Sequence, residues 1–172
     1  MSDNQKLVTV ITEEEIKAAV IKAANEYGKM YENEQLTIVA DLSSTFVFVA
    51  DLIRELPIDV TIQFVAKTKD SNSTKIDLGF ETSLKGRNVL IVSDIFYKGN
   101  ALKKLYDIVN EEEPKDVKIL SLIEKKHKDR SAELEVDSLF SIDDIFIVGY
   151  GLTANESYRG LKAIYHLQTE EK

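Results

Sequence analysis

Cysteine is absent from the sequence, and so is any long apolar run. The lack of cysteine excludes disulfide bonds and thiol catalysis, and it favours a reducing compartment. No apolar run is long enough to span a bilayer, so we expect no membrane partner. The first residues carry no basic segment followed by an apolar one, which predicts that there is no signal peptide. We therefore expect a cytoplasmic protein.

Positive charge is also scarce. The chain has 22 lysine and arginine residues against 30 aspartate and glutamate residues, a formal net charge of −8. Such a surface does not favour nucleic acid or an anionic membrane, so we expect neither as a partner. The 172 residues contain no repeat, no low-complexity segment and no linker. We predict one domain over residues 1–172.

Strand-like and helix-like segments alternate along the chain. Thr12 and Glu15 have the spacing of a capping box at the start of a helix that reaches residue 31. The other predicted segments are strands over 36–41, 59–67, 87–95, 116–125 and 145–152, helices over 43–56 and 101–113, and a polar loop over 68–75. This alternation predicts an α/β fold with a mostly parallel sheet and helices on both faces.

Residues 88–102, NVLIVSDIFYKGNAL, have the layout of a phosphate-binding strand, loop and helix start. Parallel sheets bind ligands at the carboxyl ends of their strands. We therefore expect the site near the strand ends, which the predicted boundaries place at residues 41–45, 67–70, 94–99, 124–126 and 149–153.

Four further segments carry a family resemblance. They read FVFVADLIREL (46–56), VLIVSDI (89–95), VKILSLIEKK (117–126) and FIVGYGLTANESYRGL (146–161). Through them the chain resembles the hypoxanthine–guanine phosphoribosyltransferases over nearly its whole length. The resemblance implies a type I phosphoribosyltransferase fold, a mostly parallel sheet flanked by helices with a small hood. It also implies transfer of ribose 5-phosphate from phosphoribosyl pyrophosphate to a purine with Mg²⁺, in dimers or tetramers.

The phosphoribosyl motif departs from the family pattern at its acids. The family has V-E-D-I-I-D-T-G-x-T, whereas residues 92–101 read VSDIFYKGNA. Two adjacent acids hold the ribose hydroxyls in the family; Ser93 replaces the first and Asp94 keeps the second, so we assign ribose or metal contact to Asp94. Tyr97 stands at the general-base aspartate. A phenol with a pKa near 10 is a poor base at neutral pH, so we assign no catalytic residue.

The phosphate end of the motif has changed as well. Lys98 and Ala101 replace the two threonines that bind the 5′-phosphate in the family, and Gly99 keeps the turn. We predict phosphate contacts at Lys98, Gly99, Asn100 and Ala101, where a cation and free helix N–H groups favour an anion. The alternative for Lys98 is an ordinary solvated loop lysine.

The pyrophosphate side has lost a lysine, a glycine and a carboxylate. The family's L-K-G-S reads Leu42 to Thr45 here, and we place Ser43 and Ser44 on that side. Arg159 matches an arginine that approaches pyrophosphate in the family, and the mobile lid is shorter. Thr153 replaces an aspartate that helps to hold Mg²⁺ in the family. We expect Mg²⁺ only if the chain is active, and we assign no metal ligand.

The purine side keeps more of the family pattern. Lys125 matches the lysine that binds the exocyclic oxygen of a 6-oxopurine, Phe146 matches the stacking aromatic, and Ile147 continues that strand. The alternatives are a solvated lysine and a core phenylalanine. His127 and His166 match no ligand or triad spacing.

Three functions remain open from the sequence. The first is a catalytically impaired or inactive family member that binds a purine or purine nucleotide as a regulatory or structural subunit, alone or with an active paralogue. The second is an active salvage enzyme that makes IMP or GMP. The third is a binder of another small anion through Lys98 and Arg159.

Overall fold

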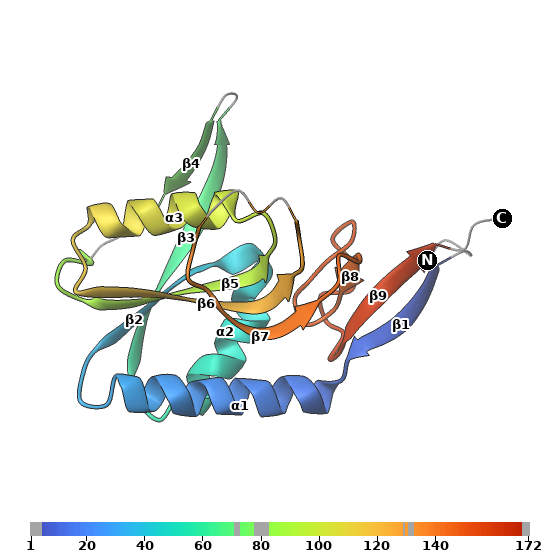
Figure 1. Cartoon of the computed structure of the whole chain (residues 1–172), viewed down its shortest axis with the longest axis horizontal. Coiled ribbons are helices and arrows are strands. Elements are labelled where there is room, and N and C mark those ends of the chain that lie inside the picture. Colours follow the sequence, from blue (N-terminus) through green and yellow to red (C-terminus); the bar gives the residue numbers. More distant parts are fainter. Residues whose placement is uncertain (1–4, 71–72, 78–82, 129, 131–132, 170–172) are drawn as a thin grey trace.

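A six-stranded sheet forms the centre of the protein, in the order β4-β3-β2-β5-β6-β7 (Figure 1). The structure is a computed structural model and describes residues 5–70, 73–77, 83–128, 130 and 133–169. The parallel strands are β3 (Val60–Asp70), β2 (Leu36–Asp41), β5 (Asn88–Phe96), β6 (Asp116–Lys125) and β7 (Asp137–Ile142). Strand β4 (Ser73–Asp77) runs antiparallel to β3 at one edge.

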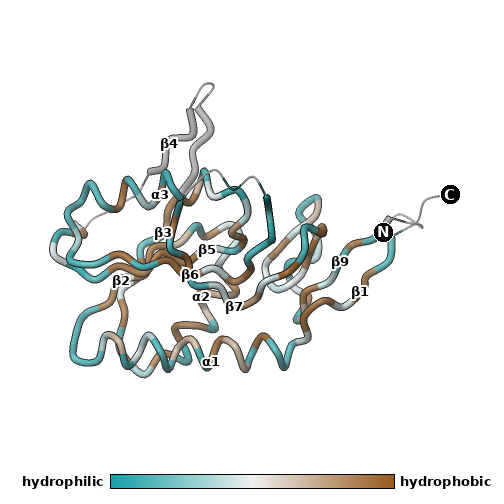
Figure 2. Tube along the Cα trace, in the orientation of Figure 1, coloured by the Kyte–Doolittle hydropathy of each residue, from teal (hydrophilic) through white to brown (hydrophobic). Residues whose placement is uncertain are grey.

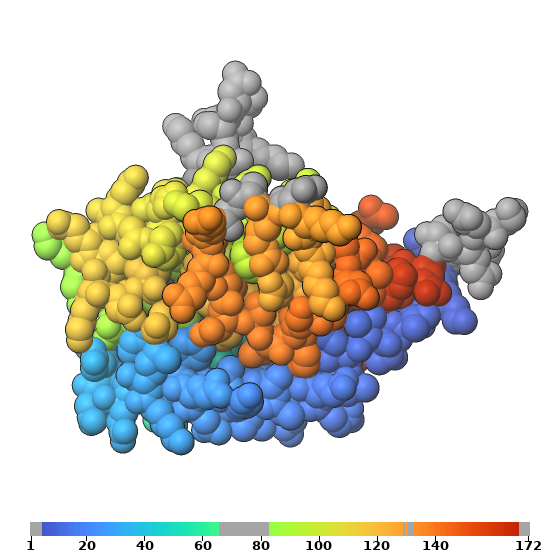
Figure 3. Space-filling model, in the orientation of Figure 1, coloured from blue at the N-terminus to red at the C-terminus, as the bar shows by residue number. Residues whose placement is uncertain are grey.

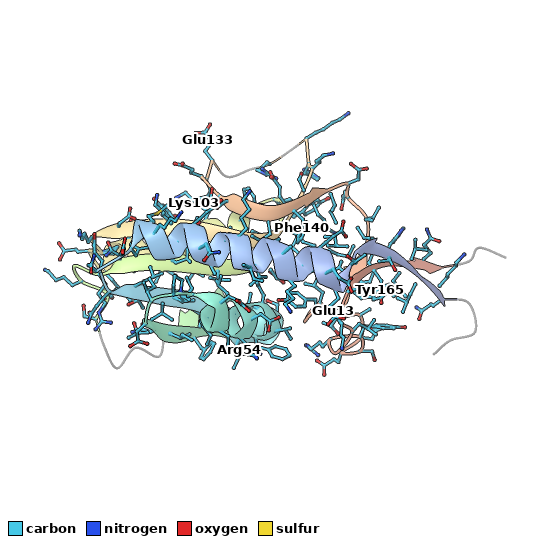
Figure 4. All side chains as sticks on the ribbon, turned by 90° about the horizontal axis from the view of Figure 1, so that it is seen from below. Glu13, Arg54, Lys103, Glu133, Phe140 and Tyr165 are labelled. Atoms are coloured by element: carbon cyan, nitrogen blue, oxygen red, sulfur yellow. The ribbon has the colours of Figure 1, made fainter. Side chains whose placement is uncertain are left out.

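Helices cover both faces of this sheet, as predicted. Helices α1 (Glu13–Met30) and α2 (Leu42–Glu55) lie side by side below it, and α3 (Asn100–Glu111) lies above it (Figures 1 and 4). The central strands are the most hydrophobic part of the chain (Figure 2). Their alternate residues face two cores: Leu90 packs with α1 and α2, and Ile91 packs with α3. No helix in the described part of the chain is long and apolar enough to cross a membrane.

A second, three-stranded antiparallel sheet forms the hood. Its order is β1 (Gln5–Ile11), β9 (Ile164–Thr169) and β8 (Ile147–Val148). The β1–β9 ribbon extends beyond the central sheet from the start of α1 (Figures 1 and 3). The family resemblance predicted both the main sheet and this small hood.

The first helix begins at the predicted capping box. The Glu15 N–H donates to Thr12 Oγ1 at 3.2 Å, and the Thr12 N–H donates to Glu15 Oε2 at 2.8 Å. Two tyrosines then tie α1 to the sheet: Tyr27 donates to Asp137 Oδ2 at 2.6 Å and Tyr31 donates to Asp116 Oδ2 at 2.8 Å. Helix α1 is therefore fixed at its start by local bonds and further along by tertiary ones.

The structure corrects two predicted segments. The helix predicted over 43–56 begins at Leu42, directly after β2, because Asp41 caps it by accepting from the Ser43 N–H at 3.1 Å. The polar loop predicted over 68–75 is instead mostly an antiparallel hairpin, with β3 reaching Asp70 and β4 starting at Ser73; residues 71–72 lie outside the described part of the chain.

The last predicted strand, over residues 145–152, is wrong in both its length and the sheet that it joins. Of residues 145–152, only Ile147 and Val148 form a strand, and it pairs antiparallel with β9 in the hood. The fifth parallel strand is β7, which the sequence interpretation missed, together with β1 and β9. Its polar sequence DSLFSI suits an edge position with one neighbouring strand.

Candidate functional site

A cleft of about 290 Å³ lies at the carboxyl ends of β2 and β5. It brings together part of the predicted site. The predicted residues among those that line it are Ser44, Asp94, Tyr97, Lys98, Gly99, Asn100 and Ala101. The residues predicted to contact phosphate and ribose therefore share one cleft, at the sheet edge where parallel strands place ligands.

The loop after β5 turns at Gly99 into helix α3. Gly99 has a φ of 86° and serves as the N-cap of α3, without a side-chain capping bond. An L-residue is strained in that left-handed region, so glycine suits this position. The first N–H groups of a helix have no partner inside the helix, and Lys98 is exposed beside them. The loop thus places a cation and several donors where an anion would fit.

Asp94 lies near the carboxyl end of β5. Its neighbours pair with β6 in one continuous register, Ser93 with Ser121 and Ile95 with Ile123. The Ile95 N–H donates to Asp94 Oδ1 at 2.7 Å. The Asp94 side chain is half-buried and lines the cleft, which suits the predicted contact with ribose hydroxyls.

Tyr97 reaches from the loop to the segment between β7 and β8. Its hydroxyl donates to Asp144 Oδ2 at 2.5 Å. Lys125 Nζ lies 3.7 Å from Asp144 Oδ1 and 5.8 Å from the centre of the Tyr97 ring. The hydrogen bond to the Asp144 carboxylate raises the pKa of Tyr97 above its ordinary value. The phenol therefore stays protonated at neutral pH.

Two other side chains pack around the same loop. The rings of His127 and Tyr97 meet edge to face, with centroids 4.5 Å apart. Arg130 donates to the Tyr97 carbonyl at 3.2 Å and to Glu124 Oε1 at 2.6 Å, and its guanidinium lies 3.9 Å from the centre of the Phe96 ring. The loop is thus anchored through both its backbone and a side chain.

The first turn of α2 uses its hydroxyls locally. The Ser43 hydroxyl donates to Asp41 Oδ1 at 2.8 Å, and the Thr45 hydroxyl donates to the Asp41 carbonyl at 2.5 Å. Ser44 lines the cleft, whereas Ser43 does not. Of the two serines predicted on the pyrophosphate side, the structure brings Ser44 to the phosphate loop.

The predicted purine residues lie outside the lining of this cleft. Lys125 ends β6, and 12% of its side chain is exposed. Phe146 is 54% exposed, which does not fit the alternative of a core phenylalanine. Ile147 is buried in the hood, where it pairs with His166 on β9. Tyr97 is the connection between the two halves, because it lines the cleft and lies beside Lys125.

Arg159 lines a different cleft, of about 450 Å³, between α1, α2 and the loop after β8. Its guanidinium donates to the Glu156 carbonyl at 3.3 Å. Lys98 lines the first cleft and not the second. The two cations of the third hypothesis therefore do not share a site.

The sequence interpretation missed Asp144, Arg130 and the contact of His127. Asp144 directly precedes the IFIVGY segment that was singled out, so a carboxylate two residues before Phe146 was an available signal. Arg130 stands in the polar stretch KKHKDRS, where no pattern distinguishes one basic residue from the next.

Comparisons with known proteins agree with this geometry. Residues 9–155 match the family model described as the phosphoribosyl transferase domain. The chain is 31% identical to the hypoxanthine phosphoribosyltransferase of Haemophilus influenzae, over 94% of this chain and 96% of that protein. It is 32% identical to the hypoxanthine phosphoribosyltransferase of Escherichia coli K12, over 90% and 92% of the two chains.

Solved structures show the same fold. A crystal structure of a hypoxanthine-guanine phosphoribosyltransferase from Bacillus anthracis aligns with a TM-score of 0.88 and 34% identity, covering 96% of this chain and all of that one. The central parallel sheet with flanking helices is thus a type I phosphoribosyltransferase fold. On both sequence and structure, the chain belongs to the hypoxanthine–guanine phosphoribosyltransferase family.

Proposed function

We propose that this protein binds a phosphoribosyl ligand, a purine nucleotide or a sugar phosphate without the base, at the cleft beside Gly99, and that it transfers ribose 5-phosphate to purines poorly or not at all. It then acts as a regulatory or structural subunit. The cleft supports the binding half of the proposal because Asp94, Lys98 and the start of α3 line it together. We further propose that residues 1–172 form one domain.

Tyr97 is the main evidence that the protein transfers ribose 5-phosphate poorly or not at all. The family resemblance puts a general-base aspartate at this position. A base must accept a proton at neutral pH, whereas the Tyr97 hydroxyl donates to Asp144 and its pKa is raised. General-base catalysis is typically worth ~10²–10⁴ in rate, so this one change predicts a large loss.

The phosphate loop adds to that loss. Ser93 and Ala101 lack the acid and the hydroxyl that the family motif has there. Each electrostatic contact at a charge-developing centre contributes ~10²–10³ to the rate, although such effects need not add. We therefore expect turnover at least ~10³ below that of an intact family member.

The family's Mg²⁺ would have few protein donors in this cleft. The lining includes two carboxylates, those of Asp41 and Asp94. Asp41, at the cleft, is engaged as the cap of α2. Thr153 offers one neutral hydroxyl oxygen, which is buried and has no hydrogen-bond partner among the described groups. Magnesium commonly takes one or two carboxylates together with substrate phosphates. Asp94 would be the carboxylate that could hold the ion here, and we assign the ion no step.

The second candidate is an active purine-salvage enzyme. Identity of 31–32% over nearly the whole length to proteins named hypoxanthine phosphoribosyltransferases favours it. If so, another group must take the role of the missing base. Asp94 is a carboxylate of the same cleft that is not used as a helix cap.

We also propose a cytoplasmic protein that assembles with itself, as a dimer or tetramer, or with an active paralogue. Leu42 and Phe46 lie one turn apart on α2 and are 48% and 40% exposed, which supports a buried contact there. Sedimentation should show an oligomer, and Phe46→Asp should shift it towards the monomer. If the purified wild-type protein sediments as a monomer, assembly with itself is excluded. Only assembly with an active paralogue then remains.

Restoring the family residues tests the catalytic half. The variant Ser93→Glu, Tyr97→Asp, Lys98→Thr, Ala101→Thr rebuilds the motif on the same scaffold. We expect it to convert hypoxanthine or guanine to the nucleotide at least ~10² faster than the wild type, because it regains a base. A wild-type rate already equal to that of the restored variant would show that the motif changes do not limit catalysis.

A further inference from the structure

We propose that Tyr97 closes the purine side of the cleft, so that the site selects a base-free phosphorylated sugar, such as ribose 5-phosphate, over a nucleotide. The inference rests on the proposed function, with the phosphate at Lys98–Ala101 and, as the family resemblance implies, a purine at Lys125 if one binds. It makes Tyr97 a specificity-determining residue.

The side chain of Tyr97 bridges the two halves of the site. Tyr97 lines the cleft beside Gly99, and its hydroxyl bonds Asp144, which also forms an ion pair with Lys125. The Lys125 ammonium lies over the ring, 5.8 Å from its centre. The phenol therefore occupies the path from the ribose position to the amino group that would bind a 6-oxopurine.

Lys125 is also engaged by charge. Asp144 Oδ1 lies 3.7 Å from Lys125 Nζ, at a site where only 12% of the lysine side chain is exposed. A purine offers a neutral carbonyl oxygen to this ammonium. A carboxylate is the stronger partner, because its full negative charge attracts the ammonium more than the partial charge of a carbonyl oxygen does. A purine that reached Lys125 would have to compete with Asp144 as well as displace Tyr97.

The loop is held in this arrangement from both sides. Arg130 bonds the Tyr97 carbonyl and Glu124, and stacks on Phe96, which is itself buried. His127 packs edge to face on the Tyr97 ring. Because the backbone and the ring each have their own anchors, the hydroxyl cannot leave Asp144 without losing packed contacts.

The part of the site that Tyr97 leaves open is small. The cleft beside the loop has a volume of about 290 Å³, just below the ~300–1,000 Å³ usual for ligand pockets. Asp94 suits sugar hydroxyls, and Lys98 suits a phosphate. The open part of the site thus matches a ribose phosphate and leaves no provision for a base.

Calorimetric titration with ribose 5-phosphate, IMP and GMP tests the inference. For the wild type we expect ribose 5-phosphate to bind at least about tenfold tighter than either nucleotide. Tyr97→Ala should tighten IMP and GMP by at least about tenfold, since base stacking and polar contacts become available. The same variant should change the affinity for ribose 5-phosphate by less than about threefold.

Asp144→Ala is a second variant that keeps the ring and removes its anchor, and it should also tighten the nucleotides. Tyr158→Phe is the matched control: it deletes a tyrosine hydroxyl that bonds Gln5 at 3.2 Å, away from the site, and should change nothing. Unfolding curves verify that each variant is folded.

The outcomes separate the two claims. Wild-type protein that binds IMP or GMP as tightly as ribose 5-phosphate overturns the inference and leaves the proposed function standing. So does a Tyr97→Ala variant with unchanged selectivity. Failure of all three ligands to bind the wild type overturns the proposed function itself, and the inference with it.

Discussion

At the phosphate loop, one lysine stands where the family motif has a hydroxyl. Lys98 is exposed, and it precedes the helix turn at Gly99. We predict that Lys98→Ala weakens ribose 5-phosphate binding by about five- to tenfold at low salt, because an ionised donor to phosphate is lost. Titration at two salt concentrations measures this.

Lys104→Ala is the control for Lys98, since it removes an exposed lysine of α3 one turn beyond the loop. The wild type should lose affinity as salt rises, and the Lys98 variant should lose less. Equal affinities in the wild type and the Lys98 variant would mean that this lysine is an ordinary solvated side chain.

At the scale of the element, helix α1 carries much of the architecture below the sheet. Its start is set by the reciprocal bonds of Thr12 and Glu15. Thr12→Ala should lower the free energy of unfolding by about 1 kcal/mol, because the Glu15 N–H at the helix start loses its acceptor, the Thr12 hydroxyl. Urea unfolding measures it, and Glu14→Gln is a control in the same turn.

A loss of less than a few tenths of a kcal/mol in Thr12→Ala would contradict this interpretation of the α1 start. Such a result would mean that the tyrosine bonds to Asp137 and Asp116 hold the helix without the cap. The control should stay within ~0.5 kcal/mol of the wild type, as surface changes usually do.

Across the whole molecule, three tyrosine–carboxylate bonds join separate layers. Tyr27 and Tyr31 connect α1 to β7 and β6, and Tyr150, after β8, donates to Asp51 of α2 at 2.7 Å. Burial, followed by the hydrogen bond to the carboxylate, raises the pKa of each phenol well above 10.0. In the unfolded chain the same phenols ionise near their ordinary pKa.

The sign of the pH effect follows from these pKa values. Their contribution is complete below the unfolded pKa of about 10. Above it the unfolded chain binds fewer protons than the folded one, so the free energy of unfolding falls as the pH rises. We predict a steep loss of stability above pH 10, measured by urea unfolding at a series of pH values.

The variant Tyr150→Phe tests whether the buried tyrosines cause this loss of stability above pH 10. It should be less stable at neutral pH, since Asp51 loses its donor. It should also show a shallower fall above pH 10, because one phenol no longer titrates. An unchanged slope would contradict the assignment of this loss to the buried tyrosines.

The sequence was most informative where local patterns determine the structure. The Thr12 capping box, the apolar β2 and β5 strands and the family segments gave the α/β fold and its hood. The sequence was least informative where the neighbouring strand determines whether a segment forms a strand. The polar segment DSLFSI forms β7 by pairing with β6. Of the segment IFIVGY, only Ile147 and Val148 form a strand, in the hood.

The site divides in the same way. Residues Asp94 to Ala101 are contiguous, so their shared cleft could be predicted from the motif. The approach of Tyr97 to Asp144 joins positions 47 residues apart, and no periodicity encodes it. The separation of Arg159 from Lys98 likewise depends on how the hood loop packs against α1 and α2.

The rate of purine transfer tests the central claim most directly. Purified protein would be given phosphoribosyl pyrophosphate, Mg²⁺ and hypoxanthine or guanine, and nucleotide formation would be compared with that of an intact hypoxanthine phosphoribosyltransferase under the same conditions. We predict a rate at least ~10³ lower, because the base and several phosphate contacts are missing. A rate within about tenfold of the intact enzyme would contradict the account.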